Sequence, residues 1–430
     1  MNIAVLGGGV TGLTVAHKLR CKHKITVYEA APTVGGLAQG FMRDNWTWYL
    51  DNTYHHVFSN DSAILSLGSE IGTPFSFYLP KTQTIFGSHN NYRIYSVDSP
   101  KDVLLLPELS VLSRLRVGAV AAFFKLTPFL SIYEQTTAHD FLKKTMGEEA
   151  WNAMWGPLFR KKFGKYAEKI VTSFIWARIK KRTRSLGYPD GGFQRFVNDL
   201  EKTLVNGEVE VKKSTRVESL TKSGDIFQLE LTNNKGETEL QNFDAVISTL
   251  PFPIFLKVGK SVLPSDYVKE QARRKYLWAV NLIVESKDKI LDKTYWLNVN
   301  AKDIPVMCVV QHTNFIDKKQ YGGKHITYFA WYVDEGDPLL HMTEEEVFEK
   351  VKPIIKTISK KDHNDIHVIK FARVPFAQPI FDTNFVGLDR SIETPVKGLY
   401  NGNLDFTYPF DRGTNYAVEL GTRVSDLVLG

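Results

Sequence analysis

Cysteine is almost absent from this sequence. Only Cys21 and Cys308 occur among its 430 residues, and they form no Cys-x-x-Cys pair. A zinc site or an iron–sulfur cluster built on cysteine ligands is therefore excluded, and no other metal site is expected. A small secreted fold held by disulfides is equally excluded, so a reduced, cytoplasmic setting is expected.

Long hydrophobic runs are lacking as well. The best candidate, Val117–Phe124, has eight residues between Arg116 and Lys125, whereas a membrane-spanning helix needs about 18. The N-terminus shows neither a charged region nor a cleavage site of a signal peptide. The wider apolar segment 103–132 is interrupted by proline and charge, and it has two interpretations. It is either a helical part of a substrate domain or an amphipathic surface that contacts the inner face of a membrane.

The composition lacks the bias of a disordered or nucleic-acid-binding chain. Hydrophobic residues make up 43% and charged residues 23%, which is typical of globular proteins. The net charge of +7 is modest for this length and accompanies no nucleic-acid-binding module, so no nucleic-acid partner is expected. A chain of 430 residues predicts two or three domains.

The most informative stretch is the N-terminal glycine motif. The apolar strand Asn2–Leu6 leads into Gly7, Gly9 and Gly12, and a helical apolar pattern follows directly. This strand–GxGxxG–helix order predicts a Rossmann unit in which backbone amides at a helix N-terminus hold a pyrophosphate. Glu29 ends the next strand, where an acid accepts hydrogen bonds from ribose hydroxyls and disfavours the 2′-phosphate of NADP.

A glycine doublet, Gly35-Gly36, follows Glu29 after six residues. With the first motif it resembles the FAD-dependent oxidoreductases of the glutathione-reductase-like superfamily. More narrowly, it resembles the branch that contains flavin amine oxidases, protoporphyrinogen oxidase, phytoene desaturase and UDP-galactopyranose mutase. Leu37 stands where many amine oxidases have arginine, which disfavours a simple monoamine oxidase.

Further motifs carry the same resemblance along the chain. Residues 51–56 resemble the family stretch D-x-G-x-H beside the isoalloxazine ring, with Thr53 in place of glycine and His55 at the histidine. Residues 187–193 resemble the turn that returns to the cofactor domain, and 244–251 resemble the family strand D-x-V-I-x-T-x-P. Residues 398–403 form a strand and glycine turn before a last helix, predicted over Tyr416–Leu429, which in the family points at the flavin.

The resemblance implies non-covalent FAD, because neither cysteine lies in a flavin-linking motif. It implies FAD contacts at these positions: Gly7, Gly9, Val10, Thr11, Gly12, Glu29, Ala30, Gly35, Gly36, Leu37, Ala38, Thr53, His55, Val217, Thr249, Gly402, Asn403, Gly413, Thr414 and Asn415. Asn403 replaces an acid that most members carry after the glycine of the turn. His55 is also the candidate catalytic residue, with a purely structural histidine as the alternative.

The positions of these motifs predict an interwoven fold of α/β plus α+β class. A glutathione-reductase-like Rossmann FAD domain would comprise residues 1–75, 186–254 and 390–430. A substrate domain of an antiparallel sheet with a helical insertion would comprise two insertions, residues 76–185 and 255–389. Alternating patterns predict strands at 277–284, 295–297, 306–310 and 326–333 in the second insertion. Aromatic residues at Trp151, Trp155, Phe159 and Phe163 share one helical face and favour a core stripe over a pocket wall.

The substrate side is open at this stage. The basic residues within 160–184 indicate a solvated face, a surface for lipid headgroups, or a site for an anionic substrate. The favoured function is an FAD-dependent oxidoreductase of oxidase or desaturase type, in which a small apolar or anionic molecule delivers hydride to flavin N5. The alternatives are a non-redox flavoenzyme similar to UDP-galactopyranose mutase and a cofactor-free binding protein similar to Rab GDP-dissociation inhibitors.

Overall fold

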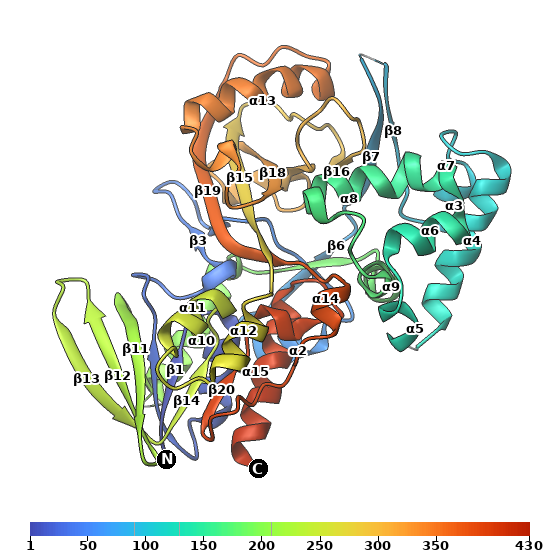
Figure 1. Cartoon of the computed structure of the whole chain (residues 1–430). Coiled ribbons are helices and arrows are strands. Elements are labelled where there is room, and N and C mark those ends of the chain that lie inside the picture. Colours follow the sequence, from blue (N-terminus) through green and yellow to red (C-terminus); the bar gives the residue numbers. More distant parts are fainter. Residues whose placement is uncertain (90, 129, 208) are drawn as a thin grey trace.

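The computed structural model describes residues 1–89, 91–128, 130–207 and 209–430. Two large sheets dominate it, and Figure 1 shows one of them at the bottom and the other at the top. A group of helices from the middle of the sequence lies to the right of both in that view. The chain passes repeatedly between these parts, so each part combines segments that are far apart in the sequence.

The lower sheet is entirely parallel. Its strand order is β10 (Glu210–Lys212), β2 (Lys24–Tyr28), β1 (Asn2–Leu6), β14 (Ala245–Ser248) and β20 (Leu399–Asn401). The central strands β1 and β14 are nearly continuous apolar runs because both faces of the sheet are covered. The predicted Rossmann strands at 2–6, 25–28 and 244–251 are confirmed, within a few residues at their ends.

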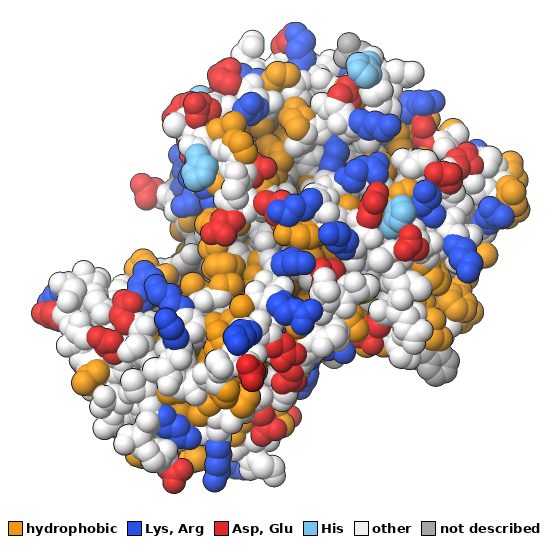
Figure 2. Space-filling model, in the orientation of Figure 1, with side chains coloured by type: hydrophobic (Ala, Val, Ile, Leu, Met, Phe, Trp, Pro, Cys, Tyr) orange, Lys and Arg blue, Asp and Glu red, His pale blue; other side chains and the backbone are white. Residues whose placement is uncertain are grey.

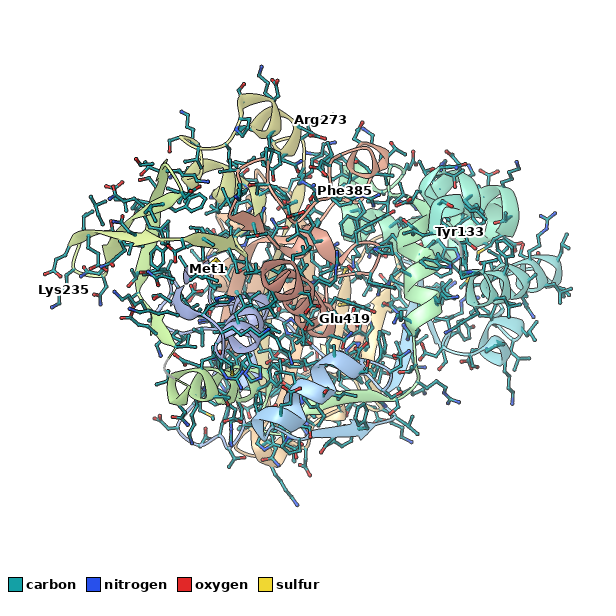
Figure 3. The ribbon with its side chains drawn as sticks, turned by 90° about the horizontal axis from the view of Figure 1, so that it is seen from below. Met1, Tyr133, Lys235, Arg273, Phe385 and Glu419 are labelled. Carbon is teal, nitrogen blue, oxygen red and sulfur yellow. The ribbon has the colours of Figure 1, made fainter. Side chains whose placement is uncertain are left out.

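Helices and a small sheet cover the two faces of the parallel sheet. The helices are α1 (Val10–Leu19), α2 (Ser62–Ile71), α10 (Phe193–Asn206) and α15 (Thr414–Leu429). The small sheet is an antiparallel meander of β11 (Thr215–Ser223), β12 (Ile226–Asn233) and β13 (Thr238–Phe243), which contacts β1 and β14. Helix α15 begins two residues earlier than expected. In Figure 3, seen from below, Glu419 of α15 lies near the centre and Lys235 marks the outer tip of the meander.

The upper sheet is mixed, which corrects the expected antiparallel sheet. Its order is β19 (Ile366–Pro379), β15 (Tyr276–Ser286), β18 (His325–Val333), β17 (Cys308–Gln311), β16 (Thr294–Val299), β7 (Lys81–Ser88) and β8 (Asn91–Tyr95). Strands β7 and β16 pair in parallel, because the β7–β8 hairpin comes from the first insertion and joins the edge of a sheet built by the second. The four strands predicted in the second insertion are confirmed, whereas β7, β8 and β19 were not foreseen.

The two faces of the mixed sheet pack against different partners. On β18, Tyr328, Ala330 and Tyr332 belong to the core shared with the parallel sheet. The intervening Phe329 and Val333 pack instead with α13 (Glu344–Ser359), which covers the outer face (Figure 1). This strict alternation follows from the two-residue period of a strand. The face of the sheet that carries Tyr328 and Tyr332 is called the inner face below.

The helical part consists of short elements, listed here with their bounds: α3 (Pro100–Leu104), α4 (Val111–Leu126), α5 (Leu130–Glu134), α6 (Ala138–Met146), α7 (Glu148–Ala150), a π-helical turn (Trp151–Trp155), α8 (Gly156–Phe163) and α9 (Thr172–Lys181). Trp151, Phe159 and Phe163 are buried and Trp155 packs partly buried against the same core, so the predicted core stripe is confirmed with Trp155 at its margin. Gly156-Pro157 opens α8 without breaking the stripe. Tyr133, labelled in Figure 3, packs in this helical core. None of the helices within the described residues combines the length and apolar character needed to cross a membrane.

Smaller elements connect these parts. Strands β5 (Val57–Phe58), β9 (Leu186–Pro189) and β6 (Phe75–Tyr78) form a short sheet, and β3 (Gly40–Phe41) pairs with β4 (Leu50–Asp51). Helices α11 (Phe252–Val258), α12 (Ser265–Gln271) and α14 (Thr383–Val386) follow β14, precede β15 and follow β19, respectively. The predicted turn at 187–193 is therefore partly a strand, because Leu186–Pro189 pairs on both sides.

Candidate functional site

The two glycine motifs meet in space. Gly7 has a φ of +105°, which reverses the chain after β1, and Gly9 forms a bridge with Gly35. A Cβ placed on Gly36 would lie 3.2 Å from the Gly9 Cα, so the loops touch through backbone alone. A Cβ on Gly9 would meet only the Gly36 Cα, at 3.9 Å, and the space beyond it is open. The arrangement is a cradle that side chains would fill.

The first turn of α1 faces this cradle. Gly9, its N-cap, has no side chain to offer, so the amides of Val10, Thr11 and Gly12 have no partner within the helix. A Cβ on Gly12 would lie 2.0 Å from the Gly7 carbonyl oxygen, which shows why the helix can start so close to the strand. Free amides and a positive helix end in an open backbone cradle fit a pyrophosphate.

Glu29 is fixed at the end of β2. One carboxylate oxygen accepts a hydrogen bond from the Gly8 amide at 2.8 Å, and the other accepts one from the Ala31 amide at 2.8 Å. Each oxygen keeps a further lone pair, so the carboxylate can also accept from two hydroxyls. Ala30 lies beside it, and the Glu29 carbonyl accepts from the Thr215 amide, which brings β11 and Val217 to the same end of the sheet. This arrangement fits a nucleoside.

The residues predicted to contact FAD after β14 and β20 form hydrogen bonds to neighbouring loops. The Thr249 hydroxyl donates to the Leu6 carbonyl at 3.0 Å, and the Gly402 amide donates to the Ser248 carbonyl at 2.8 Å. The Asn403 amide group donates to the Leu250 carbonyl at 3.1 Å and accepts from the Asp405 amide at 3.0 Å. The side chains of Thr249 and Asn403 therefore position these loops, and a ligand would meet the loops mainly through backbone.

The N-terminus of α15 carries an unpaired polar atom. The Thr414 hydroxyl oxygen is buried and has no hydrogen-bond partner within the described part of the chain, and Gly413 provides no cap. The Asn415 side chain accepts from the Ile64 amide at 3.1 Å and thereby joins α15 to α2. A free hydroxyl and free first-turn amides at a helix N-terminus suit a group that accumulates negative charge.

The loop 51–56 lies between the glycine doublet and the mixed sheet. Thr53 is buried, and its hydroxyl lies 3.3 Å from the Leu37 carbonyl, next to the short helix Gly36–Ala38. Asp51 is fully buried and accepts from the hydroxyl of Tyr188 at 2.9 Å, while its backbone carbonyl accepts from Tyr328 at 2.8 Å. Burial raises the pKa of the Asp51 carboxyl.

The two histidines of this loop differ. The His55 imidazole lies 3.8 Å from the Asp51 carboxylate and 3.4 Å from the Thr53 hydroxyl, and its Nδ1 has no hydrogen-bond partner among the described residues. Burial lowers the pKa of His56 to about 3, so its ring stays neutral beside Tyr295. His55 is therefore the histidine whose ring nitrogen lies near the Asp51 carboxylate, and its catalytic role stays a prediction.

The inner face of the mixed sheet is polar in places where a core would be apolar. Tyr54 and Tyr332 are buried there, and the Cys308 thiol lies 3.5 Å from the Tyr54 hydroxyl. Asn281 is 2% exposed, and the oxygen of its side-chain amide has no hydrogen-bond partner in the described chain. Ala330 and Ala372 lie directly opposite it on the two neighbouring strands. Small neighbours around an unpaired amide oxygen leave room for a ligand.

The basic residues of 160–184 do not form one solvated face. Lys161 donates to the carbonyls of Ala301 and Ile304, and Lys162 pairs with Asp411 at 2.7 Å. Burial and the cation of Arg178 lower the pKa of Lys162 to about 7, against the opposing effect of Asp411. Figure 2 shows Lys and Arg side chains gathered across the middle of the visible face.

Sequence reasoning missed Asn281, Lys162 and Arg412 as individual candidates. Asn281 is a polar residue at an inward position of an apolar strand, and the two-residue period could have marked it. Lys162 and Arg412 carry no such signal, because only the tertiary fold brings α8 to the loop before α15.

The chain as a whole is similar to a known protein family. The family model described as flavin containing amine oxidoreductase matches residues 10–429, so the chain belongs to this family. It is accordingly an FAD-dependent oxidoreductase, and FAD is its cofactor. No curated protein matches the chain significantly.

Several solved structures share the fold at low sequence identity. A protein from Exiguobacterium sp. 255-15, provisionally named a protoporphyrinogen oxidase, has a TM-score of 0.75 at 14% identity and covers 99% of this chain and 98% of its own. A double mutant of putrescine oxidase has a TM-score of 0.75 at 14% identity, with 100% and 98% covered. Reduced UDP-galactopyranose mutase has a TM-score of 0.75 at 15% identity, with 100% and 95% covered. The predicted resemblance is confirmed.

Proposed function

We propose that this flavoenzyme oxidises a small organic molecule that lies on the inner face of the mixed sheet and delivers hydride to flavin N5. When bound, FAD supplies the electron-accepting chemistry. The main support for this proposal is the side-chain oxygen of Asn281, which is buried on the inner face and unpaired among the described residues. Tyr328 lies on the same face, and its hydroxyl donates to the backbone carbonyl of Asp51. A polar atom left unpaired in a core is costly unless a ligand completes it.

The protein residues would divide the work. The amides of Val10 to Gly12 and the cradle of Gly9 and Gly36 would hold the pyrophosphate, and Glu29 would accept from the ribose hydroxyls. Thr414 and the first turn of α15 would stabilise negative charge on the flavin. Thr53 and His55 would line its other side. We propose non-covalent FAD and place it in a glutathione-reductase-like domain of residues 1–75, 186–254 and 390–430, with the substrate domain formed by 76–185 and 255–389.

Anaerobic reduction of the purified protein tests this proposal. Candidate substrates should bleach the flavin absorbance, and admission of oxygen or a quinone should restore it. An FAD-loaded protein that no reductant other than dithionite bleaches, and that isomerises UDP-sugars only when reduced, would instead establish the mutase alternative. That alternative is kept because one structural relative bears the mutase name.

We further propose that the helices within 103–132 contact a membrane surface. Leu105, Val111, Leu112, Leu115 and Leu126 are 57–81% exposed. Figure 2 shows hydrophobic side chains at the edge of the molecule that these helices form. Exposed Arg116 and Lys125 lie among these apolar residues, and this combination is that of an interfacial helix on anionic lipid. Phe129, within the same segment, lies outside the described residues.

A further inference from the structure

Three separate elements bring four charged groups to one end of the inner face. Lys162 comes from α8, Arg178 from α9, and Asp411 and Arg412 from the loop before α15. The Lys162 Nζ lies 5.4 Å from the ring centroid of Tyr332, and the Arg412 Cζ lies 5.0 Å from the same centroid. Two cations therefore share one buried aromatic ring of β18.

The charges of this cluster do not balance. Asp411 accepts from Lys162 at 2.7 Å and from Arg178, so the one carboxylate already serves two cations. Arg412 has no carboxylate within ion-pair distance among the described residues, and its guanidinium donates only to the Ala377 carbonyl, at 3.4 Å. A guanidinium carries five N–H donors, so most of its hydrogen-bonding capacity is unused. When Lys162 is protonated, three cations surround one carboxylate and leave an excess of positive charge. The side chains of Lys162 and Asp411 are only 14% and 16% exposed, whereas that of Arg178 is 42% exposed.

Asn281 extends the polar pattern along the sheet. Ala279 pairs with Tyr332 across the strands, and Asn281 pairs with Ala330. Asn281 and Tyr332 are thus diagonal neighbours on the inner face, roughly 7 Å apart. The side-chain oxygen of Asn281 has no hydrogen-bond partner in the part of the chain that the structure describes. A ligand with one anionic end and a donor group further along would satisfy both ends of this surface.

We infer that the substrate carries an oxyanion, a carboxylate or a phosphate, which Lys162 and Arg412 bind in front of Tyr332 while Asn281 accepts a hydrogen bond from the rest of the molecule. This inference rests on the proposed function, because it takes the inner face as the substrate side. Arg412 suits either oxyanion, since its planar fork can donate two parallel hydrogen bonds. The same excess of positive charge repels an alkyl diammonium ion, so a simple diamine is not the substrate.

Ligand titration of the FAD-loaded protein tests the inference without a known substrate. Benzoate, inorganic phosphate and the neutral benzamide are each added, and binding is followed by the flavin difference spectrum and by calorimetry. We expect at least one anion to bind saturably while benzamide does not, and the tighter anion identifies the oxyanion. Equal responses to benzoate and benzamide, or no response to either anion, would overturn the inference.

Matched variants locate the site. Arg412→Gln and Lys162→Met should each weaken anion binding by about tenfold or more. Arg412→Lys should restore part of the affinity, because it keeps the charge and loses the fork. Lys165→Met is the control, since that lysine is 62% exposed and pairs with Asp334. Unchanged affinity in Arg412→Gln and Lys162→Met, with FAD content and circular dichroism preserved, contradicts the inference. A wild-type protein without FAD would refute the cofactor site instead, so the two failures are distinguishable.

Discussion

The proposed cofactor site and the proposed substrate site of this molecule differ in the atoms that line them. Backbone atoms line most of the first, and side chains line the second. Around the cradle of Gly9 and Gly36 the ligand would meet mainly backbone, and the side chains of Thr249 and Asn403 hold the loops. On the inner face of the mixed sheet the polar groups are side chains, among them Asn281, Lys162 and Arg412. Under the proposed function, one fold would thus hold FAD in a backbone-lined site and the substrate in a side-chain-lined one.

The largest effect is expected from a substitution that disrupts only the backbone-lined cofactor site. In Gly9→Leu the new side chain enters the open cradle, where its Cβ meets no neighbour closer than 3.9 Å. The fold should therefore survive, while the affinity for FAD falls about 100-fold. The FAD released per mole of purified protein measures this loss. Gly118→Ala in α4 is the control, because a Cβ there meets nothing within 4 Å. A fully loaded Gly9→Leu protein would show that the pyrophosphate lies elsewhere.

The next effect concerns the side-chain side. Asp411→Asn removes the one carboxylate that pairs with Lys162 and Arg178. Uncompensated cations then remain in a largely enclosed place, and the free energy of unfolding should fall by about 3 kcal/mol. Urea denaturation measures it. Asp334→Asn breaks the exposed pair with Lys165 and should cost about 0.5 kcal/mol or less. Equal costs for both variants would mean that the Asp411 cluster is no more enclosed than an ordinary surface pair.

A pH dependence separates the two sides further. The pKa of Lys162 is lowered from 10.5 to about 7 in the folded protein. Between these values the unfolded chain binds a proton that the folded chain lacks, so stability rises with pH. The groups facing Lys162 keep their charge there: Asp411 has a lowered pKa, Tyr332 has a pKa of about 12, and the guanidiniums of Arg178 and Arg412 stay protonated.

The expected change in the free energy of unfolding follows from the binding of one proton by Lys162. Between about pH 7 and about pH 9 the contribution of Lys162 to the free energy of unfolding should rise by about 2 kcal/mol. Urea denaturation at both pH values, in the wild type and in Lys162→Met, isolates this contribution as the difference between the two slopes. Identical slopes would show that Lys162 titrates near its ordinary value.

The smallest expected effect lies outside both regions. Leu112→Glu in α4 should weaken binding to anionic liposomes by about tenfold, because it places charge in the apolar surface. FAD content should not change. Leu240→Glu, on the meander, alters a side chain of similar exposure, 60% against 61%, and should leave flotation with liposomes unchanged. If wild-type protein does not float with anionic vesicles, the membrane contact is refuted.

The backbone-lined cofactor site could be predicted from the sequence, whereas the side-chain-lined inner face could not. Gly7, Gly9, Gly12, Gly35 and Gly36 could be predicted because backbone sites demand residues without side chains at fixed spacing. The inner face could not be predicted, because it depends on which strands pair and in which register. Lys162 illustrates this: a lysine in a basic run is typical of a solvated surface, and only its approach to Asp411 from another element removes it from water.

The strand pairing shows the same limit. The sequence indicated strands at 277–284 and 326–333 through alternation, yet the parallel entry of β7 beside β16 depends on a contact between residues about 210 positions apart. Alternation predicts that a strand exists and which residues share a face. It does not predict the neighbouring strand, and the composition of the inner face depends on that neighbour.

The FAD content of three purified variants tests the division of labour most directly. We predict that Gly9→Leu loses most of its FAD, whereas Arg412→Gln and Asn281→Leu retain as much as the wild type. The latter two change side chains of the inner face, and Gly9→Leu fills the backbone cradle. Equal FAD loss in all three, or full retention in Gly9→Leu, would contradict the account.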